Sequence, residues 1–343
     1  MNKELIIRSH SSAVDFALLK DGKLIELNKE VEDNKFSVGD IFVGKVRKAI
    51  PGLNAAFVNV GHEKDGFLHY HDLGPKLPSL VKYIKQISTG KNKDYLLKQF
   101  RYENDINKDG NIEEVLSPKQ IVLVQVVKEP ISTKGPRLSS EISLAGRFMV
   151  LMPFSDRVSI SQKIESRAEK NRLKKLVQSI RPKGFGLIIR TVAEGQKVAA
   201  LDADIQQLLT RWKNLSIKLK QIDKYPSKVL SEINRSSSIL RDIFDDNFTG
   251  IHVDDAEMQS EIHDYIETIA PDKKSIIKLY DNHLPIFEKF GIERQIKSSF
   301  GTTVSMQKGA YLVIEHTEAL HVIDVNSGNR SNRSKSQEET AME

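Results

Sequence analysis

The chain has 343 residues, of which 39% are hydrophobic and 29% charged, values that favour a folded protein of two or more domains over a disordered chain. Lys and Arg (52) outnumber Asp and Glu (46), and the net charge of +6 permits a polyanionic partner without requiring one. The chain has no cysteine, which excludes disulfides and thiolate metal sites, and no run approaches the ~18 apolar residues of a membrane span. We therefore expect a soluble cytoplasmic protein with no membrane segment.

The first 130 residues alternate strand patterns with turns. Two period-two runs flank Asp21-Gly22, a strong hairpin signal. Residues 38–73 predict several short strands separated by glycine-containing turns, a pattern typical of a small barrel, and a β-branched strand run follows at 120–129. Between them, residues 75–118 are polar and Lys-rich and indicate an insertion.

The remaining residues mix helices and strands. Apolar spacing predicts helices at 166–180 and 199–222, with a buried strand between them in "FGLIIRTVAEG". From about residue 236, strand patterns such as "FTGIHVDD" alternate with helical ones such as "EMQSEIHDYIETIA". The sequence therefore predicts an α+β multidomain fold.

The barrel segment carries aromatic and basic residues that suit a single-stranded nucleic acid. Phe57 and Phe67, with His69 and Tyr70 nearby, could stack unpaired bases on an exposed sheet face. Basic side chains that could contact phosphates are interleaved with them: Lys45, Arg47, Lys48 and Lys64. The alternative, that both phenylalanines are core residues, is equally compatible with their spacing.

The segment from Asp105 to Leu116 imitates a calcium-binding loop. Its first residues match the acidic spacing, but Leu116 stands where a bidentate Glu is required. We reject calcium binding and predict a solvated turn.

Two further pairs carry chemistry. Arg190 and Thr191 follow a buried strand, where a guanidinium beside a hydroxyl can bind a terminal phosphate, although a surface salt bridge is the alternative. In "HVIDVNSGN", Asp324 and Asn326 lie on one face of a strand and could hold Mg²⁺ and orient a water or a phosphodiester. A turn is the alternative for an Asp-x-Asn pair.

Taken in order, five blocks resemble the ribonuclease E/G family over essentially the whole chain. They are "GKV…PGLNAAFVNVG…DGFL", "TKGPRLSSEISLAGRFMVLMP", "GLIIRTVAEG", "IKLYDNHLPIFEKFGIERQI" and "EALHVIDVNSG". The insertion and the "EISLAGR" motif resemble more closely the ribonuclease G branch of Bacteroidetes-type bacteria.

The resemblance implies a modular enzyme. Its parts would be a split RNase H-like subdomain (1–35 and 236–281), an S1 RNA-binding domain of OB fold (36–128, with the insertion at about 75–118), a 5′-sensor region (129–235) and part of a DNase I-like catalytic subdomain (282–343). Phe57, Phe67 and Lys134 would contact RNA. Four residues would bind a 5′-monophosphate: Arg190, Thr191, Gly146 and Val150. In catalysis, Asp324 would be a magnesium ligand, and Asn326 would help to orient the attacking water or the scissile phosphate.

The activity that the resemblance implies is Mg-dependent hydrolysis of single-stranded, AU-rich, 5′-monophosphorylated RNA, in RNA processing and decay and rRNA maturation. The full-length enzyme would be a homodimer. The chain departs from the family at "ISQKIE", where Gln162 and Lys163 replace an Arg-containing run. The two alternatives are a weaker grip on the 5′-phosphate and compensation by Lys163 and Arg137.

The family's second magnesium-binding Asp, its zinc-linking Cys motif and its dimerisation domain have no counterpart in the 343 residues. The expectation from sequence is thus a carboxyl-terminally truncated chain, inactive alone. The alternatives are a chain that acts only as an RNA-binding module, and a fragment that needs a partner chain.

Overall fold

The computed structural model describes residues 2–11, 13–31, 36–91, 95–231, 240–241, 243–244, 247–306 and 309–328. The chain forms two compact units. Unit 1 combines Met1–Glu32 with Asp246–Glu343, and unit 2 consists of Asp33–Asp245. The first strands therefore share a unit with residues more than two hundred positions later, and the predicted mixed α and β class is confirmed.

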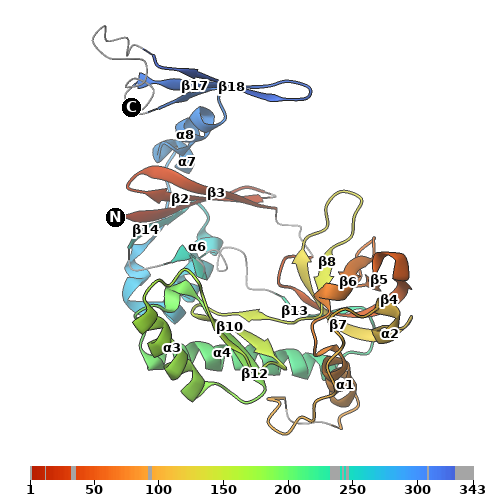
Figure 1. The fold of residues 1–343 in the computed structure, drawn as a ribbon. Helices are drawn as coiled ribbons and strands as arrows, with labels where there is room; N and C mark the ends of the chain where they lie inside the picture. The colour runs from red at the N-terminus through yellow and green to blue at the C-terminus, as the bar shows by residue number, and fades with distance from the viewer. Residues whose placement is uncertain are drawn as a thin grey trace. The chain divides into compact units, whose positions relative to one another are not determined.

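A five-stranded sheet in the order β15-β14-β1-β2-β3 forms the centre of unit 1 (Figure 1). Its strands are β1 (Lys3–Ser9), β2 (Ala13–Lys20), β3 (Lys23–Val31), β14 (Phe248–Val253) and β15 (Ile277–Leu279). The first three are antiparallel, whereas β14 pairs parallel with both β1 and β15. Asp21 and Gly22 have φ of 49° and 76°, the left-handed values of a tight hairpin turn, so the predicted hairpin is confirmed.

Helices of unit 1 cover this sheet or extend from it. They are α6 (Ala256–Ile269), η4 (Pro271–Ile276), α7 (Ile286–Lys289) and α8 (Ile292–Ser299). Asp255 caps α6 by accepting a hydrogen bond from the Met258 amide at 2.8 Å. Apolar residues of α7 and α8 bury themselves against Ile6, Ala17 and Leu19 of the sheet. A second sheet follows, made of β16 (Thr303–Ser305), β17 (Tyr311–His316) and β18 (His321–Asn326).

Unit 2 begins with a closed five-stranded barrel, in the order β4-β5-β6-β8-β7 with β7 pairing back onto β4 (Figure 1). The strands are β4 (Ile41–Ile50), β5 (Ala55–Asn59), β6 (Gly66–His69), β7 (Ile121–Lys128) and β8 (Arg137–Ser139), with the short helices η1 (Pro51–Leu53) and η2 (Tyr70–Asp72). Strand β13 (Ser227–Leu230) also pairs with β4. This closed barrel is OB-like and consistent with the expected S1 domain.

The insertion is an anchored part of unit 2. Helix α1 (Leu77–Ser88) buries an apolar stripe, and the hydroxyl of Tyr83 lies 2.7 Å from that of Ser216 on another helix. The segment expected to be a solvated turn ends in α2 (Ile112–Val115), and Ile112 and Leu116 lie in the barrel core. That expectation was wrong for its second half, because the loop that precedes α2 bonds to the barrel through Asn54.

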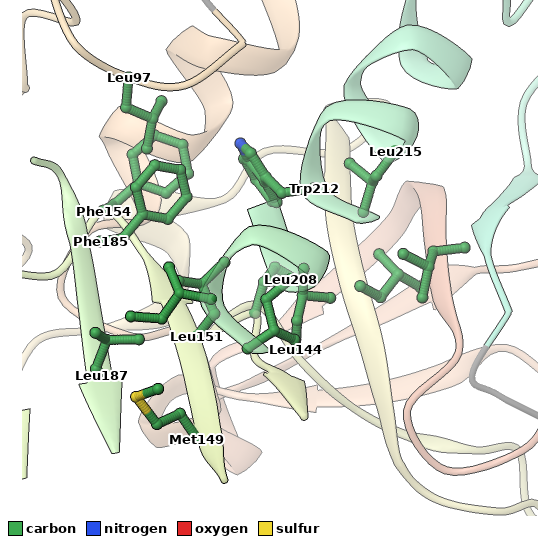
Figure 2. Packing of buried hydrophobic residues seen from close by; sticks show 14 of the residues in the cluster. Leu97, Leu144, Met149, Leu151, Phe154, Phe185, Leu187, Leu208, Trp212 and Leu215 are labelled. Carbon is green, nitrogen blue, oxygen red and sulfur yellow. The ribbon is translucent and has the colours of Figure 1, made fainter. Parts of the chain in front are cut away.

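A four-stranded sheet in unit 2 has the order β11-β12-β10-β9. Its strands are β9 (Leu144–Ala145), β10 (Met149–Pro153), β11 (Val158–Ile160) and β12 (Phe185–Ile189). The helices beside it, α3 (Arg167–Ile180) and α4 (Val198–Lys220), match the predicted spans closely, and η3 (Thr191–Ala193) follows β12. Figure 2 shows Trp212 of α4 facing Phe154 and Phe185, with Leu187, Leu151 and Met149 continuing the same buried face.

Within the described residues, no helix is both long and apolar enough to cross a membrane.

Candidate functional site

The two barrel phenylalanines form a pair on the outside of the barrel. Phe57 is the register partner of Phe67, and their rings meet edge to face with centroids 5.8 Å apart. Both are half-buried, whereas Ala56, Val58 and Leu68 next to them are fully buried. Strand alternation thus directs the core residues inward and the two rings outward. The alternative that they are core residues is not supported.

Basic groups border this aromatic pair. The Lys48 ammonium lies 5.4 Å from the centre of the Phe57 ring. Lys134 is exposed in a turn that leads into β8, where Arg137 is the register partner of Phe67. An aromatic ring can stack a base while a lysine beside it contacts the phosphate of the same strand. The arrangement suits a single strand, and the role of these residues stays a prediction.

Arg137, whose compensating role stays a prediction, is an exposed residue of β8. Its guanidinium forms an ion pair with Asp72 at 2.9 Å on the barrel. The backbone N–H of Lys163 donates to the hydroxyl of Ser161, which lies 2.9 Å from that of Thr191, and the role of the Lys163 side chain likewise stays a prediction.

Arg190 stands at the end of β12 in extended backbone, with its N–H bonded to the carbonyl of Phe148. Its guanidinium donates to the carbonyl oxygen of Gly146 at 2.9 Å, and the side chain remains partly exposed. The contact with Gly146 orients the guanidinium and uses one of its five donors. An arginine held this way, one residue from the Thr191 hydroxyl, suits an anionic oxygen group.

The buried carboxylate of Asp204 holds the backbone loop whose carbonyl orients Arg190. Asp204 of α4, only 7% exposed, accepts hydrogen bonds from the backbone N–H groups of Arg147, Phe148 and Met149 at 2.9, 2.9 and 3.0 Å. A Cβ on Gly146 would lie 2.7 Å from both carboxylate oxygens, so only glycine fits there. Burial raises the pKa of Asp204 above its usual range, against the lowering effects of the three N–H donors and of Arg190. Asp204 thereby holds the loop whose carbonyl orients Arg190.

A second contact positions the loop after Thr191. Glu169 of α3 accepts hydrogen bonds from Arg172 and from the Gly195 N–H, the latter at 2.9 Å. These bonds lower the pKa of Glu169 to about 2.

We call Gly146, Ser161, Arg190, Thr191 and Asp204 the Arg190 cluster. Val150 lies on the neighbouring strand, paired with Ile188.

The pair of Asp324 and Asn326 lies on β18, in unit 1. Asp324 is exposed, and its Oδ2 accepts a hydrogen bond from the Asn326 amide at 2.9 Å, so the two side chains share a face as expected. Mg²⁺ is usually bound through one or two carboxylates together with waters and substrate phosphates. Asp324 fits such a site as one ligand. Among the residues that the structure describes, three potential ligand groups converge at His263, Asp264 and Glu267 of α6, well apart in sequence from this pair.

Sequence reasoning missed Asp204, Ser161 and Glu169. A signal existed for Asp204, because it interrupts the apolar stripe Leu201, Ile205 and Leu208 of its helix. An acid on a buried face needs partners. The partners of Asp204 are backbone groups 55 to 57 residues away and leave no pattern in the sequence.

Comparisons with known proteins show what the chain is similar to. The model of the Ribonuclease E/G family matches residues 143–343. The chain is 33% identical over 327 residues to "Ribonuclease G" of Haemophilus influenzae, covering 95% of this chain and 62% of that protein. It is 34% identical over 346 residues to "Ribonuclease E" of Nostoc sp. (100% and 46%), and 32% identical over 329 residues to "Ribonuclease G" of Escherichia coli K12 (96% and 63%).

The chain therefore belongs to the ribonuclease E/G family. It spans less than two thirds of the length of these relatives.

Proposed function

We propose that the protein acts as an endoribonuclease that cleaves single-stranded, 5′-monophosphorylated RNA by Mg-dependent hydrolysis. Its biological role would be RNA processing and decay, including rRNA maturation, in the cytoplasm. Family membership supports the reaction class, and the observation that carries the proposal is the Arg190 cluster. There the guanidinium of Arg190 is oriented by the Gly146 carbonyl, and the hydroxyl of the next residue, Thr191, is positioned 2.9 Å from that of Ser161; an arginine and a hydroxyl are groups that can bind a terminal phosphate.

Each group has a distinct role in the proposed reaction. Phe57 and Phe67 stack bases while Lys48 and Lys134 contact the backbone, which holds the strand without regard to sequence. Arg190 and Thr191 bind the 5′-phosphate, with Gly146 and Val150 bordering them.

Asp324 would hold Mg²⁺, and Asn326 would orient the water or the scissile phosphate. When bound, the ion supplies an activated water and stabilises negative charge on the phosphate.

The subdomain assignments form part of the proposal. The sheet that unites β1–β3 with β14 and β15 supports a split RNase H-like subdomain (1–35 and 236–281), and the closed barrel supports S1 (36–128). Residues 129–235 would form the 5′-sensor region and 282–343 part of a DNase I-like subdomain. A homodimer is proposed for the full-length enzyme.

Cleavage of a 5′-monophosphorylated oligoribonucleotide, with and without Mg²⁺, tests the reaction. We expect cleavage that stops on chelation of the metal and in Asp324→Ala, while RNA binding is retained. Glu318→Ala, an exposed acid in the β17–β18 turn, is the matched control and should cleave normally. Cleavage that persists in Asp324→Ala would refute the assigned catalytic role.

The second candidate function is an RNA-binding module without catalysis. Asp324 supplies a single carboxylate, and a site with one carboxylate binds Mg²⁺ weakly unless other ligands complete it. This observation favours the second candidate. Binding without cleavage by the unaltered chain, weakened by Phe57→Ala and steeply dependent on salt, would support this candidate over the first.

A further inference from the structure

Helix α3 carries a concentration of positive charge that the proposed function does not use. Its 14 residues, "RAEKNRLKKLVQSI", include five basic side chains and one acidic one, so this helix has a net charge of +4, against +6 for the whole chain. The one acid, Glu169, is paired with Arg172 at 2.6 Å. Within the part of the chain that the structure describes, the other four basic groups form no ion pair: Arg167, Lys170, Lys174 and Lys175.

Three of these basic groups lie on one side of the helix. Arg167, Lys170 and Lys174 follow one another at intervals of three and four residues, which makes them neighbours on the helix surface. Two exposed amides, Asn171 and Gln178, lie on the same side at helical spacing. At 1.5 Å per residue, the row extends about 16 Å along the helix axis. We call these five residues the α3 basic face.

This arrangement is unfavourable for the helix by itself. Like charges three and four residues apart on a helix repel each other. Arg167 is the first residue of α3 and Lys170 the fourth, where the positive end of the helix dipole disfavours cations. At the same three-residue spacing, Glu169 and Arg172 on another side of the helix attract each other instead. A bound polyanion would relieve the repulsion, so the α3 basic face suits such a partner.

The remaining sides of α3 fix the helix in unit 2. Leu173 and Val177 are fully buried and belong to the hydrophobic core of the unit. The guanidinium of Arg172 also donates to the carbonyl oxygen of Gln196 at 3.1 Å, which ties α3 to the loop before α4. The α3 basic face is therefore presented on an anchored helix, and a partner can bind it without first ordering the backbone.

The chemistry of the face favours a nucleic-acid backbone over a membrane. It contains no apolar side chain, and Leu173 and Val177 are buried, so the helix cannot insert an apolar side into a bilayer. It contains no aromatic ring either, so it cannot stack unpaired bases as Phe57 and Phe67 could. Arginine, lysine and amide side chains do bind phosphate and ribose oxygens. A base-paired segment presents these oxygens on its outside, while its bases remain stacked within.

We propose that the α3 basic face binds the sugar–phosphate backbone of base-paired RNA, as a contact separate from the aromatic pair of the barrel. The inference rests on the proposed action on RNA and extends the substrate class. The barrel would hold an unpaired stretch, and α3 would hold a stem in the same molecule. Both elements belong to unit 2.

The test is fluorescence anisotropy with a blunt RNA duplex that carries 5′-hydroxyl ends, measured over a range of salt concentrations. This probe offers the barrel no unpaired base and Arg190 no 5′-phosphate. Each phosphate contact to a duplex contributes about 0.9 to the slope of log K against log salt concentration. Replacing Arg167→Gln, Lys170→Gln and Lys174→Gln together should therefore reduce the slope by about 2–3 and weaken binding at least about 10-fold at about 0.1 M salt. Phe57→Ala should leave duplex binding unchanged.

Two controls separate this contact from net charge and from misfolding. Lys213→Gln, Lys218→Gln and Lys220→Gln together remove the same charge from exposed lysines of α4 and should leave the slope nearly unchanged. A variant that exchanges arginine for lysine, and lysine for arginine, at the three α3 positions keeps the charge and should bind the duplex as the unaltered chain does. The emission of the buried Trp212 verifies that each variant is folded.

Three results would overturn this inference alone: no duplex binding by the unaltered chain, an unchanged slope in the α3 variant, or an equal loss in the α4 control. Binding to phosphatidylserine vesicles that the α3 variant loses, with no binding to the duplex, would assign the face to a membrane surface and overturn it as well. Failure of the unaltered chain to cleave single-stranded RNA, with duplex binding at α3 retained, would instead overturn the proposed endoribonuclease activity and support this contact.

Discussion

Replacing Asp204 by alanine should destabilise unit 2 and disable the Arg190 cluster together. The carboxylate is nearly fully buried and accepts three backbone hydrogen bonds at 2.9 to 3.0 Å. Its loss leaves the N–H groups of Phe148 and Met149 buried without an acceptor, at about 1–3 kcal/mol each, with a smaller cost for Arg147. We therefore expect Asp204→Ala to lower the free energy of unfolding by about 3–5 kcal/mol.

Urea denaturation followed by the emission of Trp212 measures this loss directly. Trp212 is the chain's one tryptophan, is fully buried and lies on the same helix as Asp204. With an m-value of about 2 kcal/mol/M, the midpoint should fall by about 2 M. Asp202→Ala is the matched control, since within the described part of the chain that half-buried carboxylate accepts a single 3.4 Å hydrogen bond, from Gln206, and the midpoint should move little.

Asp204→Asn tests the link to function. An amide keeps one oxygen acceptor but turns an NH₂ group toward backbone donors, so the loop that carries the Gly146 carbonyl should shift. We expect a milder destabilisation of about 1–2 kcal/mol, with reduced preference for 5′-monophosphorylated over 5′-hydroxyl RNA. A midpoint change below about 0.5 M for Asp204→Ala would refute the reasoning that the three hydrogen bonds hold this loop.

Three further outcomes are expected. Gly135→Ala should destabilise the barrel by about 1–3 kcal/mol in thermal denaturation, because the added Cβ would lie 2.3 Å from the Asp65 carbonyl oxygen. Gly52→Ala is the control and should be nearly neutral, since a Cβ there has nothing within 4 Å. Equal effects of the two substitutions would contradict the steric argument. The folded-state pKa of Glu169 is lowered from 4.5 to about 2, so the contribution of this carboxylate to stability is present above pH 4.5 and is lost as the pH falls toward 2. Glu169→Gln should flatten this part of an acid titration followed by circular dichroism. An unchanged titration would count against the contact with Arg172. Tyr83→Ala should cost about 3–5 kcal/mol in urea denaturation, because the ring stacks on Trp212 at 5.6 Å in the core; a loss under 1 kcal/mol would show that the insertion is dispensable for unit 2.

Local patterns predicted the elements well. The Asp21-Gly22 hairpin, helices α3 and α4 and strands β7, β12 and β14 all follow from turn chemistry and apolar periodicity, because these signals arise from neighbours in the chain. The insertion was harder to interpret. Its polar residues dominate the composition, and the few apolar ones that anchor it, such as Tyr83 and Ile112, gain their role from partners far away in sequence.

The sequence by itself determined the family and the residues of its motifs, since ordered blocks of side chains can be read without coordinates. Only the tertiary structure decided how those residues are held: Phe57 against Phe67, Arg190 on the carbonyl of Gly146, and that loop on the carboxylate of Asp204. The physical reason is that these contacts join positions about ten to almost sixty residues apart, and two of them use backbone atoms that every residue type possesses. A sequence records which side chains are present, whereas burial and long-range hydrogen bonding exist only once the chain is folded.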